Sequence, residues 1–422
     1  MSMADITDAG PRLGERHWRE GYEQLAEEVR VSAPTARPVL ISSTVVVDDI
    51  YVMTPGTLGS LQTGSATKGG LAAELALAVN GLLSEGRDGE LFADWAEGQR
   101  WLAEVLGPPN RVQVGGTGAQ AAWALDLLGA PTLMALESRS PEQLRVLAPG
   151  ILVCRQGRTM PVHEVPADTD ARPIRNEILE FPGGSGLLGN HAERSHRVIV
   201  RFSPIHPERD EEFMAMQEEL GPNAGAALVS GFNGLGATDR ASVEWARRLL
   251  RVWQQCGPGL RHLELGDTAR PGDLKAIVVG LRGMTSSLGL SLSELSTFWG
   301  PSTDVAAKAL ELAVGLECPC VVVHADRWSL AVHSSDAGAV VRRLMTGNLL
   351  ASARAAAGAP RSYVTPVSHA IYAEDVPESG PLDKGWRVDC VPAPFVPRPA
   401  STIGLGDTFT AGLLLAAALE GG

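Results

Sequence analysis

Cysteine is scarce in this sequence, which has five cysteines scattered among 422 residues. Their number is odd, and the closest pair, Cys318 and Cys320, is spaced too tightly for an ordinary zinc-binding motif. These observations favour neither a disulfide framework nor a zinc site. We expect reduced, mostly buried thiols.

Long apolar runs are also missing, because no stretch of about 18 residues lacks charged residues or helix breakers. The first residues, Met1–Pro11, are polar and contain no apolar core of the kind that a signal peptide needs. We therefore expect no membrane-spanning helix and no membrane partner, and we expect a cytoplasmic protein.

Basic residues are in the minority, with 36 lysines and arginines against 49 acidic residues and a formal net charge of −13. This balance argues against nucleic acid as a partner. Hydrophobic residues are plentiful, at 44% of the chain. A chain of this length and composition has enough apolar surface for about two to three domain-sized units, or for one large domain with a cap.

The most informative stretch lies near the C-terminal end, at Ser401–Leu415, where a small-residue turn with Gly404 and Gly406 opens an apolar helical run. Backbone N–H groups and the helix dipole converge at such a turn and make an anion site. Asp407 lies in the same turn, where a carboxylate is placed to take a proton from a hydroxyl that attacks the bound anion. This pattern indicates phosphoryl transfer to an alcohol. The competing interpretation is that Asp407 is only a helix cap.

The β-branched run Pro38–Tyr51 predicts one buried strand of a parallel sheet. Asp48 and Asp49 then lie near the carboxyl end of that strand, where open α/β sheets place ligand-binding groups. The alternative is an ordinary solvated strand exit.

A second glycine turn supports a rival hypothesis. Gly116, Gly118 and Ala121 fit the dinucleotide-binding fingerprint, and Glu137 ends the next apolar run at the expected distance. An NAD(P)-dependent oxidoreductase is therefore an alternative function. That fingerprint leaves Asp407 and its glycines without a role.

Strands alternating with helices predict a doubly wound, mostly parallel sheet. Strands are expected at 111–114, 132–136, 197–202, 226–231, 259–265, 320–324 and 328–333. Helices are expected at 15–31, 70–83, 89–106, 238–255, 271–282, 291–298, 303–316 and 335–357. Between 138 and 195 the pattern changes to short apolar runs with Pro, Gly and charge, which indicates an inserted, strand-rich cap.

Acidic residues on the C-terminal side supply candidate metal ligands. His262 and Glu264 share one face of a strand because side chains alternate with period two. Glu294 opens a helix, and carboxylates beside a phosphate site hold hydrated Mg²⁺. The alternative for Glu294 is a capping box with Ser291.

Two further pairs have weaker signals. Arg197 and Arg201 border a strand end, where the alternative is an ordinary surface arginine. His324 and Trp328 flank a loop and suit a purine, although core packing is the commoner fate of such residues.

Taken together, these stretches resemble the ADP-dependent sugar kinases, that is, the ADP-dependent glucokinases and phosphofructokinases of the ribokinase-like superfamily. The likeness covers roughly residues 15–420. It is carried by Val47–Ile50, Gly89–Phe92, Val114–Ala119, Asn176–Phe181, Ser195–Arg197, Leu228–Asn233, His262–Leu265, Ser291–Glu294, Val323–Val332 and Ser401–Gly412.

The resemblance implies a ribokinase-like α/β fold with a small strand-rich lid, ADP as donor, Mg²⁺ as cofactor and a sugar as acceptor, in a monomer or homodimer. It implies a large domain from 1–49, 113–137 and 196–422, and a lid from 50–112 and 138–195. The implied catalytic residues are Asp407, Gly404 and Gly406, and the implied metal ligands are Glu264 and Glu294. The implied substrate-binding residues are Asp48, Glu90, Gly116, Thr117 and Asn176, and the implied nucleotide-binding residues are Arg197, His324, Gly404 and Leu405.

This sequence departs from the family pattern at three places: Ser291 and Thr117 replace asparagines, and Asn176 replaces a histidine. Thr117 and Asn176 lie where the family touches sugar, so the acceptor stays open, and an inactive sugar- or nucleotide-binding relative is a further alternative. Asp48 and Glu90 would repel a sugar phosphate, which favours a neutral sugar. Arg155 and Arg158 in the expected lid favour the opposite.

Overall fold

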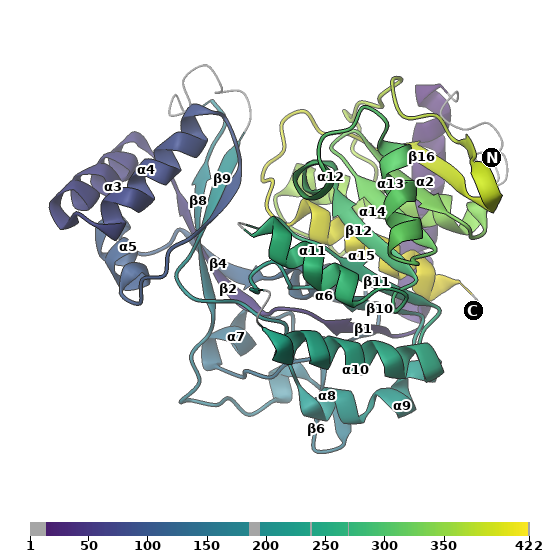
Figure 1. Cartoon of the computed structure of the whole chain (residues 1–422), viewed down its shortest axis with the longest axis horizontal. Coiled ribbons are helices and arrows are strands. Elements are labelled where there is room, and N and C mark those ends of the chain that lie inside the picture. The colour runs from purple at the N-terminus through teal and green to yellow at the C-terminus, as the bar shows by residue number, and fades with distance from the viewer. Residues whose placement is uncertain (1–13, 185–194, 237–238, 269, 421–422) are drawn as a thin grey trace.

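The computed structural model describes residues 14–184, 195–236, 239–268 and 270–420, and these form a large and a small β-sheet with flanking helices (Figure 1). The large sheet has the strand order β15-β16-β14-β13-β12-β11-β10-β1-β5-β6-β7. Its central strands, from β13 to β6, pair in parallel, and antiparallel strands complete both edges. The expected mostly parallel sheet is confirmed. Its strands are β1 (Val39–Ser42), β5 (Thr132–Met134), β6 (Leu152–Arg155), β7 (Arg158–Pro161), β10 (Ala226–Val229), β11 (Leu260–Glu264), β12 (Ser287–Ser291), β13 (Cys320–His324), β14 (Trp328–His333), β15 (Gly380–Pro381) and β16 (Arg387–Pro392).

Two hydrophobic cores lie on opposite faces of this sheet. Strand β1 shows the alternation, because Val39 and Ile41 belong to one core and Leu40 to the other. The first core takes side chains from α2 (Glu15–Ser32), α6 (Thr117–Leu127), α7 (Pro141–Val146), α14 (Ala337–Ala357) and α15 (Leu405–Leu419). The second takes side chains from α8 (Glu211–Ala215), α9 (Gln217–Leu220), α10 (Arg240–Cys256), α11 (Pro271–Gly280), α12 (Leu292–Trp299) and α13 (Val305–Gly315). Helices on both faces make the sheet doubly wound, as the sequence predicts.

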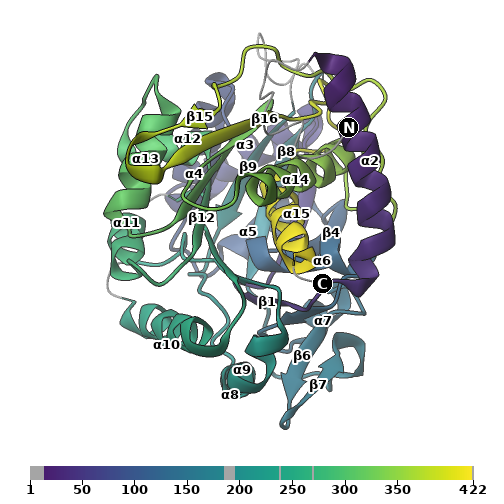
Figure 2. The same ribbon diagram turned by 90° about the vertical axis from the view of Figure 1, so that its right-hand side faces the viewer.

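Helices α14 and α15 pack side by side, with α2 outside them, as Figure 2 shows. Helix α15 also packs against α6. Short 3-10 turns complete the described part: η2 (Ala33–Thr35), η3 (Val162–Glu164), η5 (Gly221–Asn223) and η6 (Asp383–Gly385).

The small sheet has the order β3-β9-β8-β2-β4 and lies with its helices beside the large sheet (Figure 1). We call this part the lid, and the part around the large sheet the large domain. Its strands are β2 (Val46–Val52), β3 (Gly89–Phe92), β4 (Arg111–Gly115), β8 (Arg175–Phe181) and β9 (His196–Arg201). Helices α3 (Pro55–Lys68), α4 (Leu71–Ser84) and α5 (Gly98–Leu106) enclose a separate core on one face of this sheet. From the other face Ile50, Ile178 and Ile199 contact Ile403, which lies just before α15.

The prediction of one strand over Pro38–Tyr51 is wrong. The run forms two strands in different sheets, because β1 ends at Ser42 and β2 begins at Val46. Asp48 and Asp49 therefore lie inside a strand of the lid and not at the end of a large-sheet strand. The expected boundary at residue 49 is wrong for the same reason. Nothing local marks the crossing, since Ser42, Ser43 and Thr44 are all buried.

Other expected lid boundaries are also wrong. Strands β6 and β7 lie between 138 and 195 but extend the large sheet, whereas β4 and β9 belong to the small one. The segment 89–106, expected as one helix, forms β3 and α5. Strand partners decide these assignments, and partners distant in the sequence leave no local signal. The β6–β7 pair closes through Gln156 and Gly157, both at positive φ, which suits a tight antiparallel turn.

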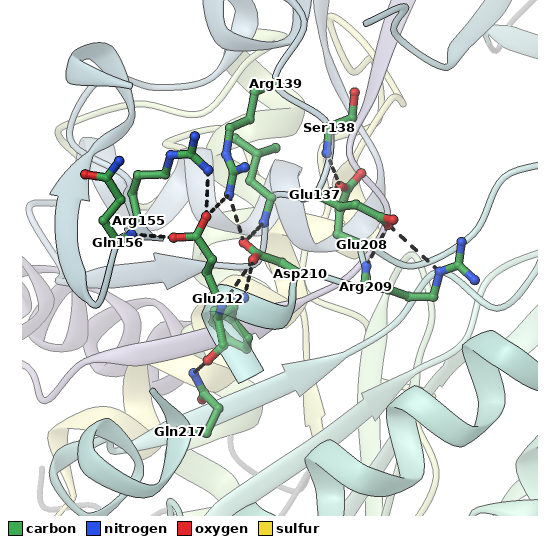
Figure 3. A network of polar contacts seen from close by, with 12 residues as sticks. Glu137, Ser138, Arg139, Arg155, Gln156, Glu208, Arg209, Asp210, Glu212 and Gln217 are labelled. Atoms are coloured by element: carbon green, nitrogen blue, oxygen red, sulfur yellow. Dashed lines mark hydrogen bonds and ion pairs between the residues drawn. The ribbon is translucent and has the colours of Figure 1, made fainter. Parts of the chain in front are cut away.

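A polar network ties the returning chain to the junction between the sheets (Figure 3). The buried Glu208 carboxylate accepts backbone hydrogen bonds from Glu137 at 2.7 Å and Ser138 at 3.1 Å. The Glu208 N–H donates to the carbonyl of Ser43, and Asp210 accepts from the N–H of Leu136. The network thus fixes the exit of β5 against the crossing that leads to the lid.

None of the helices in the described part of the chain has the length and apolar character needed to span a bilayer. All five cysteines are free thiols: Cys154, Cys318, Cys320 and Cys390 are buried, and Cys256 is half-buried. The expectation of unpaired, mostly buried thiols is confirmed.

Candidate active site at the start of helix α15

The glycine turn before α15 exposes unpaired backbone donors. Gly404 is the N-cap residue, with φ +69° in the left-handed region, and Leu405 is the first helical residue. The first bond of the helix runs from the N–H of Thr408 to the carbonyl of Gly404. No side chain of the described residues caps this end. The first N–H groups of α15 and the positive end of its dipole are thus available to an anion.

Asp407 lies three residues after the N-cap position and makes no capping bond. Its carboxylate accepts a hydrogen bond from the Thr117 side chain of α6. Burial raises the pKa of Asp407, and the Arg354 guanidinium and Thr117 act in the opposite direction. The N-cap interpretation therefore does not describe this residue.

The starts of α6 and α15 converge at this point. Gly116, with φ +91°, approaches the carbonyl of Thr44 so closely that a Cβ there would overlap it. A Cβ on Gly115 would overlap the Asp48 carboxylate, so only a glycine at position 115 leaves room for the Asp48 side chain. The two glycines thereby bring Asp48 of the lid close to Asp407, whose negative charge raises the pKa of Asp48.

A chain of polar contacts continues from Asp48 across the lid sheet. Asn176 Nδ2 donates to Asp48 Oδ1 at 2.9 Å, and Arg201 Nε donates to Asn176 Oδ1 at 3.2 Å. Arg201 also forms an ion pair with Glu90. The strand register explains the first contact, since Asp48 and Asn176 are paired residues of β2 and β8. The structure thus brings together three of the expected substrate-binding residues.

Asp48 is 4% exposed. Burial raises its pKa to about 7, with Asp407 adding to the effect and the hydrogen bond from Asn176 opposing it. The Asp48 carboxyl group can therefore gain or lose a proton near neutral pH. A hydrogen bond donated by a hydroxyl group would stabilise its charged form.

Glu264 at the end of β11 is held by two histidines. His262 Nε2 donates to Glu264 Oε2 at 2.7 Å, and His324 Nε2 donates to Glu264 Oε1 at 3.1 Å. Burial alone would raise the pKa of Glu264, but these bonds lower it to about 2. The His324 ring lies against Gly406, so the structure places this residue at the glycine turn. Trp328 packs instead against the second core.

Glu294 forms the capping box that the sequence offered as an alternative. Its Oε2 accepts from the N–H of Ser291 at 2.7 Å, and the Ser291 hydroxyl accepts from the N–H of Glu294. Burial raises the pKa of Glu294 to about 7, against the lowering effect of His324 and with a further rise from Glu264. The two acids are therefore neighbours in the same electrostatic environment.

Glu264 and Glu294 offer carboxylate oxygens, which are the ligands that magnesium takes in proteins. In the described ranges no three His, Cys, Asp or Glu side chains are arranged to hold a metal. A carboxylate oxygen with one protein partner keeps a second lone pair for water, and Mg²⁺ commonly retains several waters while phosphates supply other ligands. Glu264, which is bonded to the histidine at the turn, and its neighbour Glu294 fit that role as oxygen donors.

Arg197 of β9 connects the lid to the turn. Its Nη1 donates to the hydroxyl of Thr402 at 3.0 Å and lies 3.7 Å from the Asp88 carboxylate. On the neighbouring strand Glu180 accepts a bond from Ser401 at 3.1 Å. With the isoleucine contacts described above, these bonds set the lid directly against the segment that leads into α15.

Other residues weighed from the sequence lie elsewhere. Arg155 pairs with Glu212 at 2.6 Å on the large sheet (Figure 3), so the idea that it binds a phosphate from the lid is wrong. Glu137 accepts a bond from the backbone of Arg209. The strand before Gly116 is β4, which runs antiparallel in the small sheet, so the turn does not belong to a parallel βαβ unit. This arrangement removes the structural basis of the dinucleotide hypothesis.

Two residues of the site were missed or undervalued from the sequence. Arg201 lies two positions along from Ile199 and four from Arg197, so period two places all three on one face of β9. That spacing is a usable signal. Arg354 lies in an alanine-rich part of α14, where no local pattern marks it.

Comparisons with known proteins agree with this geometry. The profile described as "ADP-specific Phosphofructokinase/Glucokinase conserved region" matches residues 71–345, which is well over half of the chain. A solved "ADP-dependent kinase complex with fructose-6-phosphate and ADPbetaS" superposes with a TM-score of 0.78 at 18% identity, covering 97% of this chain and 99% of that one. Searching curated protein sequences gives no match.

Two further solved structures share the fold. A hypothetical ADP-dependent phosphofructokinase from Pyrococcus horikoshii OT3 has a TM-score of 0.70 at 17% identity, over 91% of this chain and 98% of that one. The last common ancestor of ADP-dependent phosphofructokinases from Methanosarcinales has a TM-score of 0.70 at 18% identity, over 97% of this chain and 99% of that one.

Proposed function

Because this chain belongs to the ADP-specific phosphofructokinase/glucokinase family and therefore transfers a phosphoryl group from a nucleotide to a sugar hydroxyl, we propose that Asp407 is its general base and ADP its donor. The observation that carries this assignment is the position of Asp407. It is a half-buried carboxylate beside the first N–H groups of α15, and no side-chain cap bond is found at this helix start among the described residues.

The proposed step is an in-line displacement on the terminal phosphorus of the nucleotide. Asp407 accepts the proton of the acceptor hydroxyl as its oxygen forms the new P–O bond. The bond between that phosphorus and the bridging oxygen breaks, and AMP leaves with the electron pair when ADP is the donor. The N–H groups from Gly404 to Asp407 stabilise the charge on the oxygens of the transferred group.

We assign the acceptor to the face of the lid that carries Asp48, Asn176 and Glu90. Carboxylate and amide oxygens there match sugar hydroxyls. Asp48 and Glu90 are acidic, and the nearby Arg201 is already paired with Glu90. These four residues therefore offer no unpaired positive charge that could bind a phosphate group on the acceptor. A neutral sugar is therefore our proposed substrate class.

The acceptor assignment predicts that neutral hexoses are phosphorylated faster than their monophosphates when both are compared at equal concentration with ADP and MgCl₂. Asp48→Asn should raise the KM for the sugar more than the KM for ADP. Its control is Asp49→Asn, because Asp49 is the adjacent residue of β2 but forms an ion pair with Arg175 instead. Activity confined to phosphorylated sugars would contradict the assignment.

We also propose that Glu264 and Glu294 hold a hydrated Mg²⁺ ion. Bound there, the ion would neutralise negative charge on the nucleotide phosphates. The two histidines orient Glu264 and keep it ionised, and Ser291 orients Glu294. Orientation of this kind sets how firmly a carboxylate holds a metal and its waters.

Glu264→Gln should raise the Mg²⁺ concentration needed for half-maximal activity by about 10-fold or more, the usual effect of disturbing groups around a metal. Activity is measured across a Mg²⁺ titration at saturating ADP and sugar. The control is Glu317→Gln, which removes an exposed carboxylate paired with Arg282. A titration curve that coincides with that of the parent would rule out the metal role of Glu264.

A further inference from the structure

A buried arginine lies directly against the glycine turn before α15. Arg354, near the end of α14, is 2% exposed. A Cβ built on Gly404 would overlap its guanidinium, so the two groups are in direct contact. Position 404 therefore needs glycine for two reasons: its backbone has a positive φ, and the Arg354 guanidinium fills the space that a Cβ would occupy.

Arg354 bridges the two helix starts that form the site. Its Nη1 donates to the hydroxyl of Thr408 in α15 at 2.8 Å, and its Nη2 donates to Gln120 Oε1 in α6 at 2.7 Å. Gln120 in turn donates to the carbonyl of Val114, at the end of β4. One side chain therefore holds the turn before α15 and, through Gln120, the turn that presents Thr117.

The charge of Arg354 has no direct partner. Its hydrogen-bond partners are neutral, its Nε has no partner, and no ion pair joins it to a carboxylate in the part of the chain that the structure describes. The guanidinium also lies 5.8 Å from the Trp123 ring. Burying an uncompensated cation is costly. The acids that offset it are Asp407 and Asp48.

We propose that Arg354 is a positioning residue for phosphoryl transfer: it braces both helix starts and places a fixed positive charge beside Asp407, behind the N–H groups that receive the phosphoryl group. The inference rests on the proposed role of Asp407. In this proposal Arg354 does not touch substrate, because its guanidinium is buried against Gly404. It acts through the turn, through Thr117 and through its field at the reacting groups.

Other charges also act on Asp407 and must be considered. Arg197 of β9 adds to the effect of Arg354 on Asp407, whereas Glu264 of β11 opposes it. Asp407 in turn raises the pKa of Asp48 in β2. His324 of β13 lies within electrostatic reach as well. Arg354 is the largest of the influences that oppose burial at Asp407. Loss of its charge should therefore make both Asp407 and Asp48 harder to ionise, so both effects move the acid limb of the rate profile in the same direction.

The test compares Arg354→Met and Arg354→Lys with the control Arg343→Met. Arg343 lies nearer the start of α14 and pairs with Glu420. The rate as a function of pH and the affinity for ADP are measured for each. In Arg354→Met we expect turnover to fall by about 10-fold or more, the acid limb to move to higher pH and ADP to bind more weakly. Arg354→Lys should keep the parent's acid limb, because it keeps the charge, but lose turnover. Arg343→Met should resemble the parent.

An acid limb and an ADP affinity in Arg354→Met that coincide with the parent's would overturn the inference. If Arg354→Met does not fold, Gln120→Glu tests the same point, since it leaves the guanidinium in place and neutralises it with a carboxylate. Its acid limb must then move to higher pH, and an unmoved limb overturns the inference. Asp407→Asn is measured in the same series. If it keeps the parent's turnover, the proposed function fails. If Asp407→Asn has a low turnover but the acid limb of the pH–rate profile of Arg354→Met coincides with the parent's, only the proposed role of Arg354 fails.

Discussion

Replacing Asp407 by asparagine should leave the protein folded and lower its turnover number by about 10²–10⁴-fold, the usual contribution of a general base. Asparagine has nearly the same shape and still accepts a hydrogen bond from Thr117, but it cannot take a proton. The affinity for ADP should persist or increase, because a negative charge beside the phosphates has been removed. Steady-state kinetics, calorimetric titration with ADP and thermal unfolding provide the three readouts.

The matched control is Asp304→Asn. Asp304 is a true N-cap, whose carboxylate accepts a bond from the N–H of Ala307 at the start of α13. Asparagine caps about as well as aspartate, so this variant should keep both its stability and its turnover. If Asp407→Asn behaves like Asp304→Asn, then Asp407 is not the base.

Gly404→Ala should have the second-largest effect, lowering turnover by about 10²-fold or more, the cost of losing one donor of an anion hole. Alanine is strained at φ +69°, and its Cβ would displace the Arg354 guanidinium. We also expect the free energy of unfolding to fall by about 1–3 kcal/mol from backbone strain. Turnover, ADP affinity and denaturant unfolding measure these effects.

Gly157→Ala separates strain from function. Gly157 has φ +72° in the β6–β7 turn, and a Cβ there would meet nothing within 4 Å. This control should lose comparable stability and keep the parent's turnover. Equal turnover in Gly404→Ala and its parent would mean that the turn does not bind the transferred group.

Groups that a short local pattern places together could be predicted from the sequence. The glycines before Asp407 and the period-two pair His262 and Glu264 are examples, because turn and strand geometry place these groups together without help from distant segments. The alternation of strands and helices from β10 to β13 likewise predicts the doubly wound sheet, although the sequence does not predict β12 itself.

What depends on long-range pairing could not be found. The run that contains Asp48 has no glycine or proline at the point where it leaves the large sheet, so it looks like one strand. The partners of β6 and β9 are set by segments far away in the chain. Arg354 contacts Gly404 and Gln120 across three helices, and the sequence around it differs little from any alanine-rich helix.

The contacts between lid and turn suggest why the site is built across two sheets. Asp48 and Asn176 come from the lid, whereas Asp407 comes from the large domain. In our proposal the acceptor and the base therefore meet only when the two sheets are held together. Closure of this kind excludes water, which would otherwise take the phosphoryl group.

The most direct test of the central claim, that Asp407 accepts the proton of the acceptor, is a single-turnover measurement of phosphoryl transfer in Asp407→Asn and its parent. Enzyme in excess over ADP, with Mg²⁺ and saturating sugar, isolates the chemical step from product release. We predict that the variant binds ADP at least as tightly as the parent but forms AMP and sugar phosphate about 10²–10⁴-fold more slowly. A variant that transfers the phosphoryl group at the parent's rate would contradict the account.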